Sequence, residues 1–111
     1  MPFIDVDEDN FYEIMAREFE KEKVVVLKFG SEYCDACQVM EMELEELCDR
    51  LHNVSVLNID CNASGYLMQQ YLIEEVPTTI VFHKPDKQLF YRTGIMLADD
   101  MVEVIVKQGN I

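Results

Sequence analysis

Two cysteines follow a buried-strand pattern in the segment Val24-Val25-Val26-Leu27-Lys28-Phe29-Gly30-Ser31-Glu32-Tyr33-Cys34-Asp35-Ala36-Cys37. The run 24–29 is rich in β-branched residues and almost entirely apolar, which indicates a strand covered on both faces, as in the middle of a parallel sheet. Gly30 ends this run. From Cys37 onward apolar residues recur at helical spacing, so the cysteine pair is predicted to open a helix.

A thiol at the start of a helix is chemically favoured as a nucleophile. The first helical turn has four unpaired N–H groups and a partial positive charge, which stabilise a thiolate and lower its pKa. We therefore expect Cys34 to attack disulfides. Cys37 follows three residues later and is predicted to face inward, where it can attack the mixed disulfide formed by Cys34.

The rest of the chain alternates between strand and helix patterns. Strands are expected at 3–6, 24–29, 54–60, 78–83 and 88–93. Helices are expected from Asp7, as N-cap, to 21–23, then over the stripe 37–51, at 63–72 and at 99–108. In the last helix the residues expected to face inward are Met101, Val102, Ile105 and Val106. This order predicts an α/β fold with helices on both faces of a central sheet of four to five strands, which the terminal hairpin makes mixed.

Length and charge limit the classes of protein to consider. The 111 residues are expected to form a single domain, 1–111, that needs no disulfide or metal to fold. The formal charge of −13 argues against unaided binding to nucleic acid or an anionic membrane. The sequence beginning Met1-Pro2-Phe3 lacks the pattern of a signal peptide. We therefore expect a cytoplasmic protein, in a reducing compartment where cysteines more often serve chemistry than act as structural links.

The chain resembles the thioredoxin family almost from end to end. The segment 29–37 lies where the family has its Trp-Cys-Gly-Pro-Cys motif, and Asn58-Ile59-Asp60 resembles the family's third strand. Val76-Pro77-Thr78 resembles the cis-proline segment that faces the cysteines and pairs with the substrate backbone, and Gly94 matches the glycine after the last strand. The resemblance implies the thioredoxin fold and a cis peptide bond before Pro77.

The resemblance also implies an activity, that of a thiol–disulfide oxidoreductase of the protein-disulfide-reductase type acting through Cys34 and Cys37. The residues then expected to bind substrate are Tyr33, Val76, Pro77 and Gly94. The implied partners are disulfide-containing proteins and an electron donor resembling the flavin-dependent thioredoxin reductases. The protein is expected to be a monomer without bound cofactor or metal, acting in electron transport and redox homeostasis.

Three departures from the family pattern affect this expectation. Lys28 stands where the family has a buried Asp, Gly30 and Tyr33 replace the tryptophans, and Asp35-Ala36 replaces Gly-Pro. A buried Lys28 is expected to favour a nearby thiolate, whereas Asp35 opposes it. Alternatively, Lys28 lies on an edge strand and extends to water.

Two other functions stay open at this point. The departures favour a thioredoxin-fold binding or chaperone-like module whose cysteines rarely turn over. The second open function is metal or iron–sulfur binding at the cysteine pair, between two chains. Pro77 argues against this function. Cys48 cannot complete a zinc site within one chain, because it lies ~16 Å further along the helix from Cys37.

The remaining cysteines, histidines and acidic runs are expected to be structural or solvated before any other role. Cys48 is expected in the core, and Cys61 is expected to be an inert or partly exposed thiol, with an accessory redox role as the alternative. His52 and His83 are expected to be solvated. The acidic runs are expected to be solvated helix faces, or else to steer the protein toward a basic partner.

Overall fold

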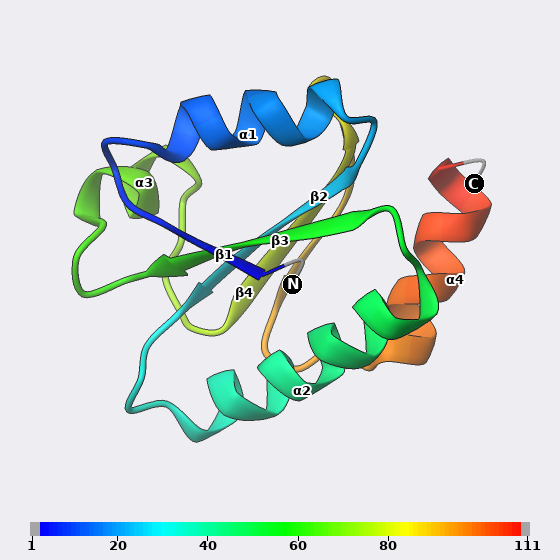
Figure 1. The fold of residues 1–111 in the computed structure, drawn as a ribbon. Helices are drawn as coiled ribbons and strands as arrows, with labels where there is room; N and C mark the ends of the chain where they lie inside the picture. Colours follow the sequence, from blue (N-terminus) through cyan, green and yellow to red (C-terminus); the bar gives the residue numbers. More distant parts are fainter. Residues whose placement is uncertain (1–2, 110–111) are drawn as a thin grey trace.

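The computed structural model describes residues 3–109. Met1 and Pro2, which are part of the signal-peptide expectation, lie outside the described residues. The last two residues of the expected domain also lie outside them. A five-stranded mixed sheet forms the centre, in the order β1-β3-β2-β4-β5 (Figure 1). The strands are β1 Phe3–Val6, β2 Val24–Gly30, β3 Val54–Asp60, β4 Thr78–Lys84 and β5 Lys87–Thr93. β2 is central, parallel to β3 and antiparallel to β4, and every residue in it is buried. The predicted fold class is confirmed.

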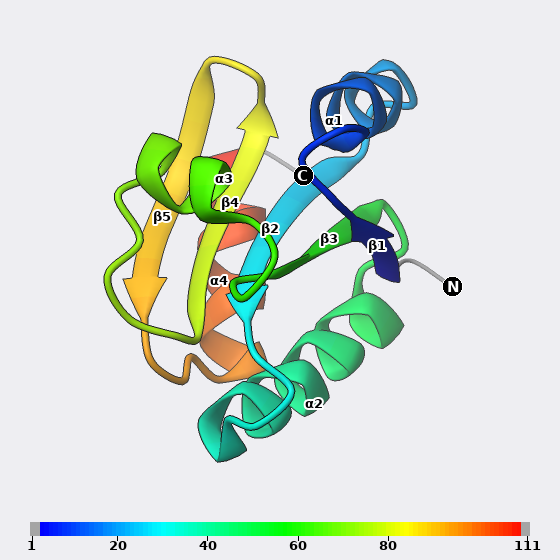
Figure 2. The ribbon, with the colours of Figure 1, turned by 90° about the vertical axis from the view of Figure 1, so that its left-hand side faces the viewer.

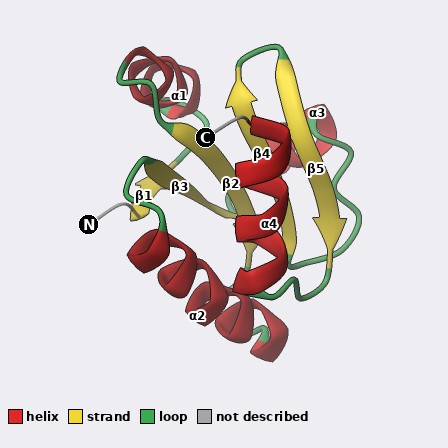
Figure 3. Cartoon of the chain, turned by 90° about the vertical axis from the view of Figure 1, so that its right-hand side faces the viewer, coloured by secondary structure: helices red, strands yellow, loops and turns green. Residues whose placement is uncertain are grey.

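Four helices cover the two faces of the sheet. They are α1 Phe11–Glu20, α2 Asp35–Arg50, α3 Gly65–Gln70 and α4 Ala98–Gly109. α1 and α3 lie over one face, as Figure 2 shows, and pack on a core that includes Phe11 and Leu67. α2 and α4 lie over the other face and pack on a core that includes Leu44 and Ile105 (Figure 3). None of the helices in residues 3–109 has the length and apolar character needed to cross a membrane.

The start of α1 differs from the prediction, because Asn10 rather than Asp7 occupies the N-cap position. Asp7 nevertheless makes the hydrogen bonds of a capping residue one turn earlier. Its carboxylate accepts from the backbone N–H groups of Asp9 and Asn10 at 2.9 and 3.0 Å, and the Asn10 side-chain oxygen accepts from the Asp7 N–H at 2.8 Å. This reciprocal pair resembles a capping box and fixes the entry of the chain into the helix.

The other helices also depart from their predicted limits. α2 ends at Arg50, before the predicted stop at Asn53, and α3 is shorter than 63–72. Val106 was expected to face inward, but it is 39% exposed. The buried side of α4 is narrower than predicted: Met101 and Ile105 are fully buried in the core under this face, whereas Val102 is only partly buried.

Candidate active site

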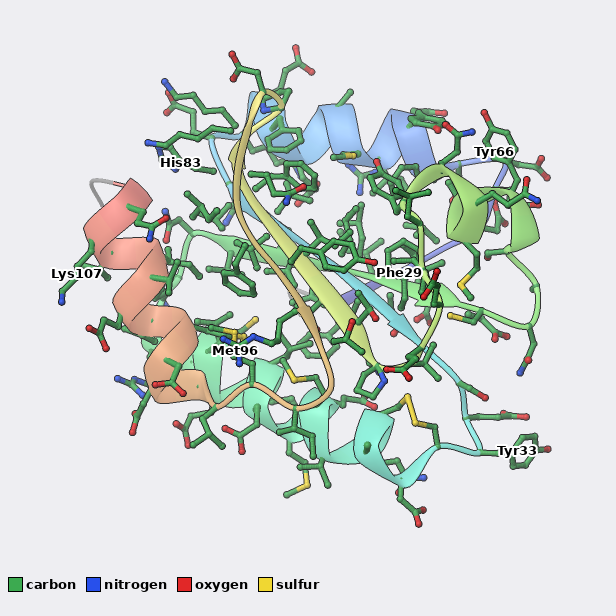
Figure 4. All side chains as sticks on the ribbon, turned by 180° about the vertical axis from the view of Figure 1, so that it is seen from behind. Phe29, Tyr33, Tyr66, His83, Met96 and Lys107 are labelled. Carbon is green, nitrogen blue, oxygen red and sulfur yellow. A yellow bond between two sulfur atoms is a disulfide. The ribbon has the colours of Figure 1, made fainter. Side chains whose placement is uncertain are left out.

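The two cysteines of the motif lie where the loop after β2 meets α2. Cys34 is the N-cap residue, with an extended backbone, and its sulfur accepts a hydrogen bond from the Cys37 N–H at 3.1 Å. A disulfide joins the two residues, whose Cα atoms are 5.1 Å apart, and Figure 4 shows it at the start of α2. Cys34 is half-buried, whereas Cys37 is only 1% exposed. The predicted position of the pair at a helix N-terminus is confirmed.

Two loops distant in sequence meet the cysteine pair. The Val76–Pro77 peptide bond is cis, as the resemblance implied. The Val76 carbonyl oxygen lies 3.9 Å from the Cys34 sulfur, and the Pro77 carbonyl accepts from the Gly94 N–H at 2.8 Å. Gly94 has φ +87°, a conformation that favours glycine. Of the four residues expected to bind substrate, Val76 thus contacts Cys34 directly, and Gly94 is joined to the neighbouring Pro77.

Tyr33 lies apart from these loops. Its side chain is 88% exposed and points away from the body of the domain (Figure 4). It directly precedes Cys34, so it belongs to the same surface although it contacts little of it. The structure therefore leaves this large aromatic ring free to meet a partner.

Lys28 is buried, with 6% of its surface exposed, on the central strand of the sheet. The expected burial is confirmed, and the alternative of an edge-strand lysine is wrong. Asn58 on β3 and Thr79 on β4 lie opposite it in the sheet. Its ammonium lies 3.9 Å from a carboxylate oxygen of Glu41 on α2. A buried cation thus lies between the sheet and the helix that carries the redox pair.

Comparison with known proteins agrees with this geometry. A family model described as Thioredoxin matches residues 2–107. The chain belongs to the thioredoxin family. The thioredoxin of Chlamydia muridarum (strain MoPn / Nigg) is 30% identical over 102 residues, which cover 92% of this chain and 94% of that protein. Two solved structures are each 26% identical. Spinach chloroplast thioredoxin F (short form) has a TM-score of 0.80 and covers 98% of this chain and 94% of its own. A thioredoxin f2 in complex with ferredoxin:thioredoxin reductase has a TM-score of 0.79 and covers 96% and 94%.

Membership of the thioredoxin family establishes the activity class. The chain is a thiol–disulfide oxidoreductase that reduces disulfides, and its redox pair is Cys34 and Cys37. The thioredoxin fold of this chain brings the cis-proline loop to that pair.

Gly30, which has no side chain, leaves room for Lys28. A Cβ atom at position 30 would lie 3.2 Å from Lys28 Cε, 3.4 Å from Lys28 Nζ and 3.5 Å from Cys37 Sγ. Because both atoms lie within 3.5 Å of this Cβ position, the Lys28 ammonium and the Cys37 sulfur are at most about 7 Å apart. This distance is within the range of direct electrostatic interaction. The lysine therefore lies close enough to influence Cys37.

A cleft of about 460 Å³ opens beside these groups, and its charged and thiol lining consists of Asp5, Lys28, Glu32, Cys37, Glu41 and Asp60. Neither Glu41 nor Asp5 was expected from the sequence to belong to the site. The available signal for Glu41 was its spacing, because residues four apart share a helix face and Glu41 follows Cys37 by four. Asp5 gave no such signal, because only the pairing of β1 with β3 brings it to this cleft. Asp35, by contrast, is exposed in the first turn of α2.

The other two cysteines are free and half-buried. Burial raises the pKa of Cys48 to about 11, with Asp49 and Glu45 adding to the effect. Burial likewise raises the pKa of Cys61 to about 11, with Asp60 adding to it and Lys28 opposing it. Cys48 is thus less buried than predicted, and the two cysteines do not bridge each other. Both are poor nucleophiles at neutral pH.

The histidines lie away from the redox pair. His52 is exposed, as predicted. His83, however, is half-buried, and its Nδ1 is buried with no hydrogen-bond partner among the described residues. Burial lowers the pKa of His83, with Lys87 and Lys84 adding to the effect. Within residues 3–109 no group of three or more His, Cys, Asp or Glu side chains is arranged to hold a metal ion.

Proposed function

We propose that Cys34 attacks a disulfide of a protein substrate and that Cys37 resolves the mixed disulfide. The observation that supports these roles is the contrast in burial: Cys34 is half-buried at the start of α2, whereas Cys37 is 1% exposed. The Cys34 thiolate displaces one substrate thiolate, and the Cys37 thiolate then attacks the Cys34 sulfur and displaces the second. Two electrons pass to the substrate, which takes up two protons, and the chain is left with its own disulfide.

The substrate backbone is proposed to lie along the loops around Cys34. The Val76 carbonyl and the Pro77–Gly94 contact border the sulfur, which supports pairing of an extended peptide with this edge. Tyr33 would add apolar contact, since its ring is exposed beside Cys34. Lys28 is proposed to stabilise the Cys37 thiolate, with Asp35 acting in the opposite direction from its exposed position.

An external donor must reduce the disulfide again after each turnover. A related thioredoxin f2 has been solved in complex with ferredoxin:thioredoxin reductase, which supports a donor of the reductase class and a role in electron transport. The exchange chemistry itself needs no bound cofactor. Two free, half-buried thiols at Cys48 and Cys61 support a reducing compartment such as the cytoplasm.

We further propose that the whole chain, 1–111, acts as one monomeric domain. The size of the folded part supports this, since a chain of this length suits one domain, and its two cores share one sheet. The charge of −13 supports the absence of unaided nucleic-acid or membrane binding. Sedimentation of the purified protein tests the monomer, and cell fractionation tests the location.

Insulin reduction by dithiothreitol tests the proposed roles. The wild-type protein should accelerate the reaction, and Cys34→Ser should abolish the acceleration. Reduced Cys37→Ser, freed of dithiothreitol before it meets oxidised insulin, should accumulate mixed disulfides with the substrate. A wild-type protein that gave no acceleration would instead favour a binding module. Alkylation of the reduced protein at neutral pH should label Cys34 first, and earlier labelling of Cys37 would show that the roles are reversed.

A further inference from the structure

A row of polar residues crosses the sheet beneath the redox pair. Asn58 lies opposite both Lys28 and Asp5 in the parallel pairing, and its side-chain amide donates to the Asp5 carboxylate at 2.9 Å. Thr79 lies opposite Lys28 on β4. The preceding residues of β2 on this face, Val24 and Val26, pack in the apolar core under α2. Along β2, the apolar core therefore ends at Val26, and from Lys28 onward this face of the sheet borders the open cleft that Cys37 also lines.

The Lys28 ammonium is weakly satisfied for a buried charge. Among residues 3–109, its closest acidic partner is the Glu41 carboxylate at 3.9 Å, longer than a hydrogen bond. Thr79 Oγ1, on the neighbouring strand, is buried and has no hydrogen-bond partner among the described residues. A buried cation normally has close partners, so this ammonium can pair more closely with another anion within reach.

Reduction of the disulfide supplies such an anion. The uncharged disulfide offers Lys28 no counterion, so the ammonium is left with Glu41. The Cys37 thiolate of the reduced protein would lie at most about 7 Å from the ammonium, before any movement of the lysine chain. Glu41 lies one helical turn beyond Cys37 on the same helix. Thiolate and carboxylate thus approach one cation from neighbouring turns of α2.

We propose that Glu41 competes with the Cys37 thiolate for Lys28, and that this competition sets the reduction potential of the Cys34–Cys37 pair. The inference rests on the proposed role of Lys28. Glu41 is a positioning residue in this scheme, because it acts on the sulfur by holding the lysine. By drawing the ammonium away from the sulfur, Glu41 disfavours the thiolate, so the disulfide becomes a weaker oxidant.

Other charged groups face the same cleft, and the experiment must separate them from Glu41. Asp5 comes from β1, Asp60 from β3 and Glu32 from the loop before Cys34. Each carboxylate disfavours a nearby thiolate through space, whatever Lys28 does. In residues 3–109, however, Glu41 is the carboxylate that pairs with Lys28. Its effect should therefore depend on the lysine, and theirs should not.

The test is a double-mutant cycle on the reduction potential, measured against glutathione at one alkaline pH. The proteins are wild type, Glu41→Gln, Lys28→Met and the double variant. Glu41→Gln should make the disulfide a stronger oxidant, by about tenfold in the exchange constant, or ~30 mV. In the Lys28→Met background the same substitution should give less than half of that shift. Lys28→Arg keeps the cation and should restore the full response to Glu41→Gln.

Glu45→Gln is the matched control. Glu45 is exposed on α2, one turn beyond Glu41, and its neutralisation removes the same charge without touching Lys28. It should leave the potential unchanged. Equal shifts from Glu41→Gln with and without Lys28 would overturn the proposal, as would no shift at all. Insulin reduction by the same four proteins distinguishes failure of this proposal from failure of the proposed function. If wild type reduces insulin but the potential shifts of the two substitutions are additive, only the role of Glu41 is refuted.

Discussion

Replacing Lys28 with methionine removes a charge and little else. The side chain is 6% exposed, and methionine has a similar length and an apolar, flexible chain that suits the site. Because a buried ammonium is costly to desolvate, the free energy of unfolding should stay the same or rise. Any change in redox behaviour then reports the lost charge and not a loss of folded protein.

The structure sets the size of the expected effect. Two unit charges about 7 Å apart interact by about 2.4 kcal/mol at an effective dielectric constant of about 20. The Glu41 carboxylate 3.9 Å from the ammonium and the open cleft screen this interaction, so we expect about half of it to reach Cys37. That corresponds to roughly one pKa unit in the Cys37 thiol. If all of it appears in the reduced state, the reduction potential falls by on the order of 30 mV in Lys28→Met.

The sign of the effect fixes its pH dependence. Under the proposed role of Lys28, the Cys37 thiol of wild type should lose its proton at a lower pH than that of Lys28→Met. Below both pKa values the thiol is protonated in both proteins, and their potentials should coincide. The gap should open as the pH rises through the wild-type pKa and reach its full size above that of the variant. The window therefore lies between the two pKa values of the Cys37 thiol, with that of wild type at its lower end.

Two measurements check this prediction. Potentials of both proteins against glutathione, taken across the window, should diverge with rising pH. Thiolate absorbance in the Cys34→Ser background, with and without Lys28→Met, reports the Cys37 pKa, because the other two thiols, Cys48 and Cys61, have pKa values raised to about 11. Equal potentials at the alkaline end, together with equal Cys37 pKa values, would refute the reasoning. The ammonium would then be fully neutralised by its other neighbours.

Three further predictions follow from other parts of the molecule. Burial alone would raise the pKa of Glu18, but hydrogen bonds from Ser55, at 2.6 Å, and from Arg17 and Lys21 bring it below its ordinary value. Glu18→Gln should therefore cost about 1–2 kcal/mol of unfolding free energy above pH 5, and urea unfolding should show that cost disappearing as the pH falls through the folded-state pKa. Gly94→Ala should cost about 1 kcal/mol or more in the same assay, since φ is +87°; an unchanged midpoint would contradict this. Iodoacetamide at pH 7.5 should label Cys48 and Cys61 far more slowly than Cys34 in the reduced protein, because their pKa values are about 11; mass spectrometry showing equal rates would count against their inertness.

Most of the correct fold predictions came from patterns of neighbouring residues along the chain. The order of the nine elements was correct, because apolar periodicity reports directly whether a segment is a strand or a helix. The same is true of the cysteine pair, whose position after a buried strand already placed it at a helix start. The ends of the helices were predicted less accurately. For example, α1 starts later than Asp7 indicated, because the hydrogen bonds to the Asp7 carboxylate form a turn that precedes the helix.

The errors fall on residues whose surroundings come from elsewhere in the chain. Val106 matched a helical stripe but is exposed, because the width of a buried stripe depends on the neighbouring elements. His83 was expected to be solvated, yet packing around β4 leaves its Nδ1 buried without a partner among the described residues. Neither outcome is encoded by the residues on either side in the sequence.

The sequence by itself determined the chemistry and the chain order. A C-x-x-C pair after a buried strand specifies a redox thiol at a helix N-terminus, and the Val-Pro-Thr segment indicates the loop opposite it. Only the tertiary structure decided that Lys28, Glu41 and Cys37 share one cleft, with Gly30 leaving the space between them. The reason is physical. Helix and strand patterns follow from neighbours along the chain, whereas the strength of a charge acting on a sulfur depends on distances that only folding sets.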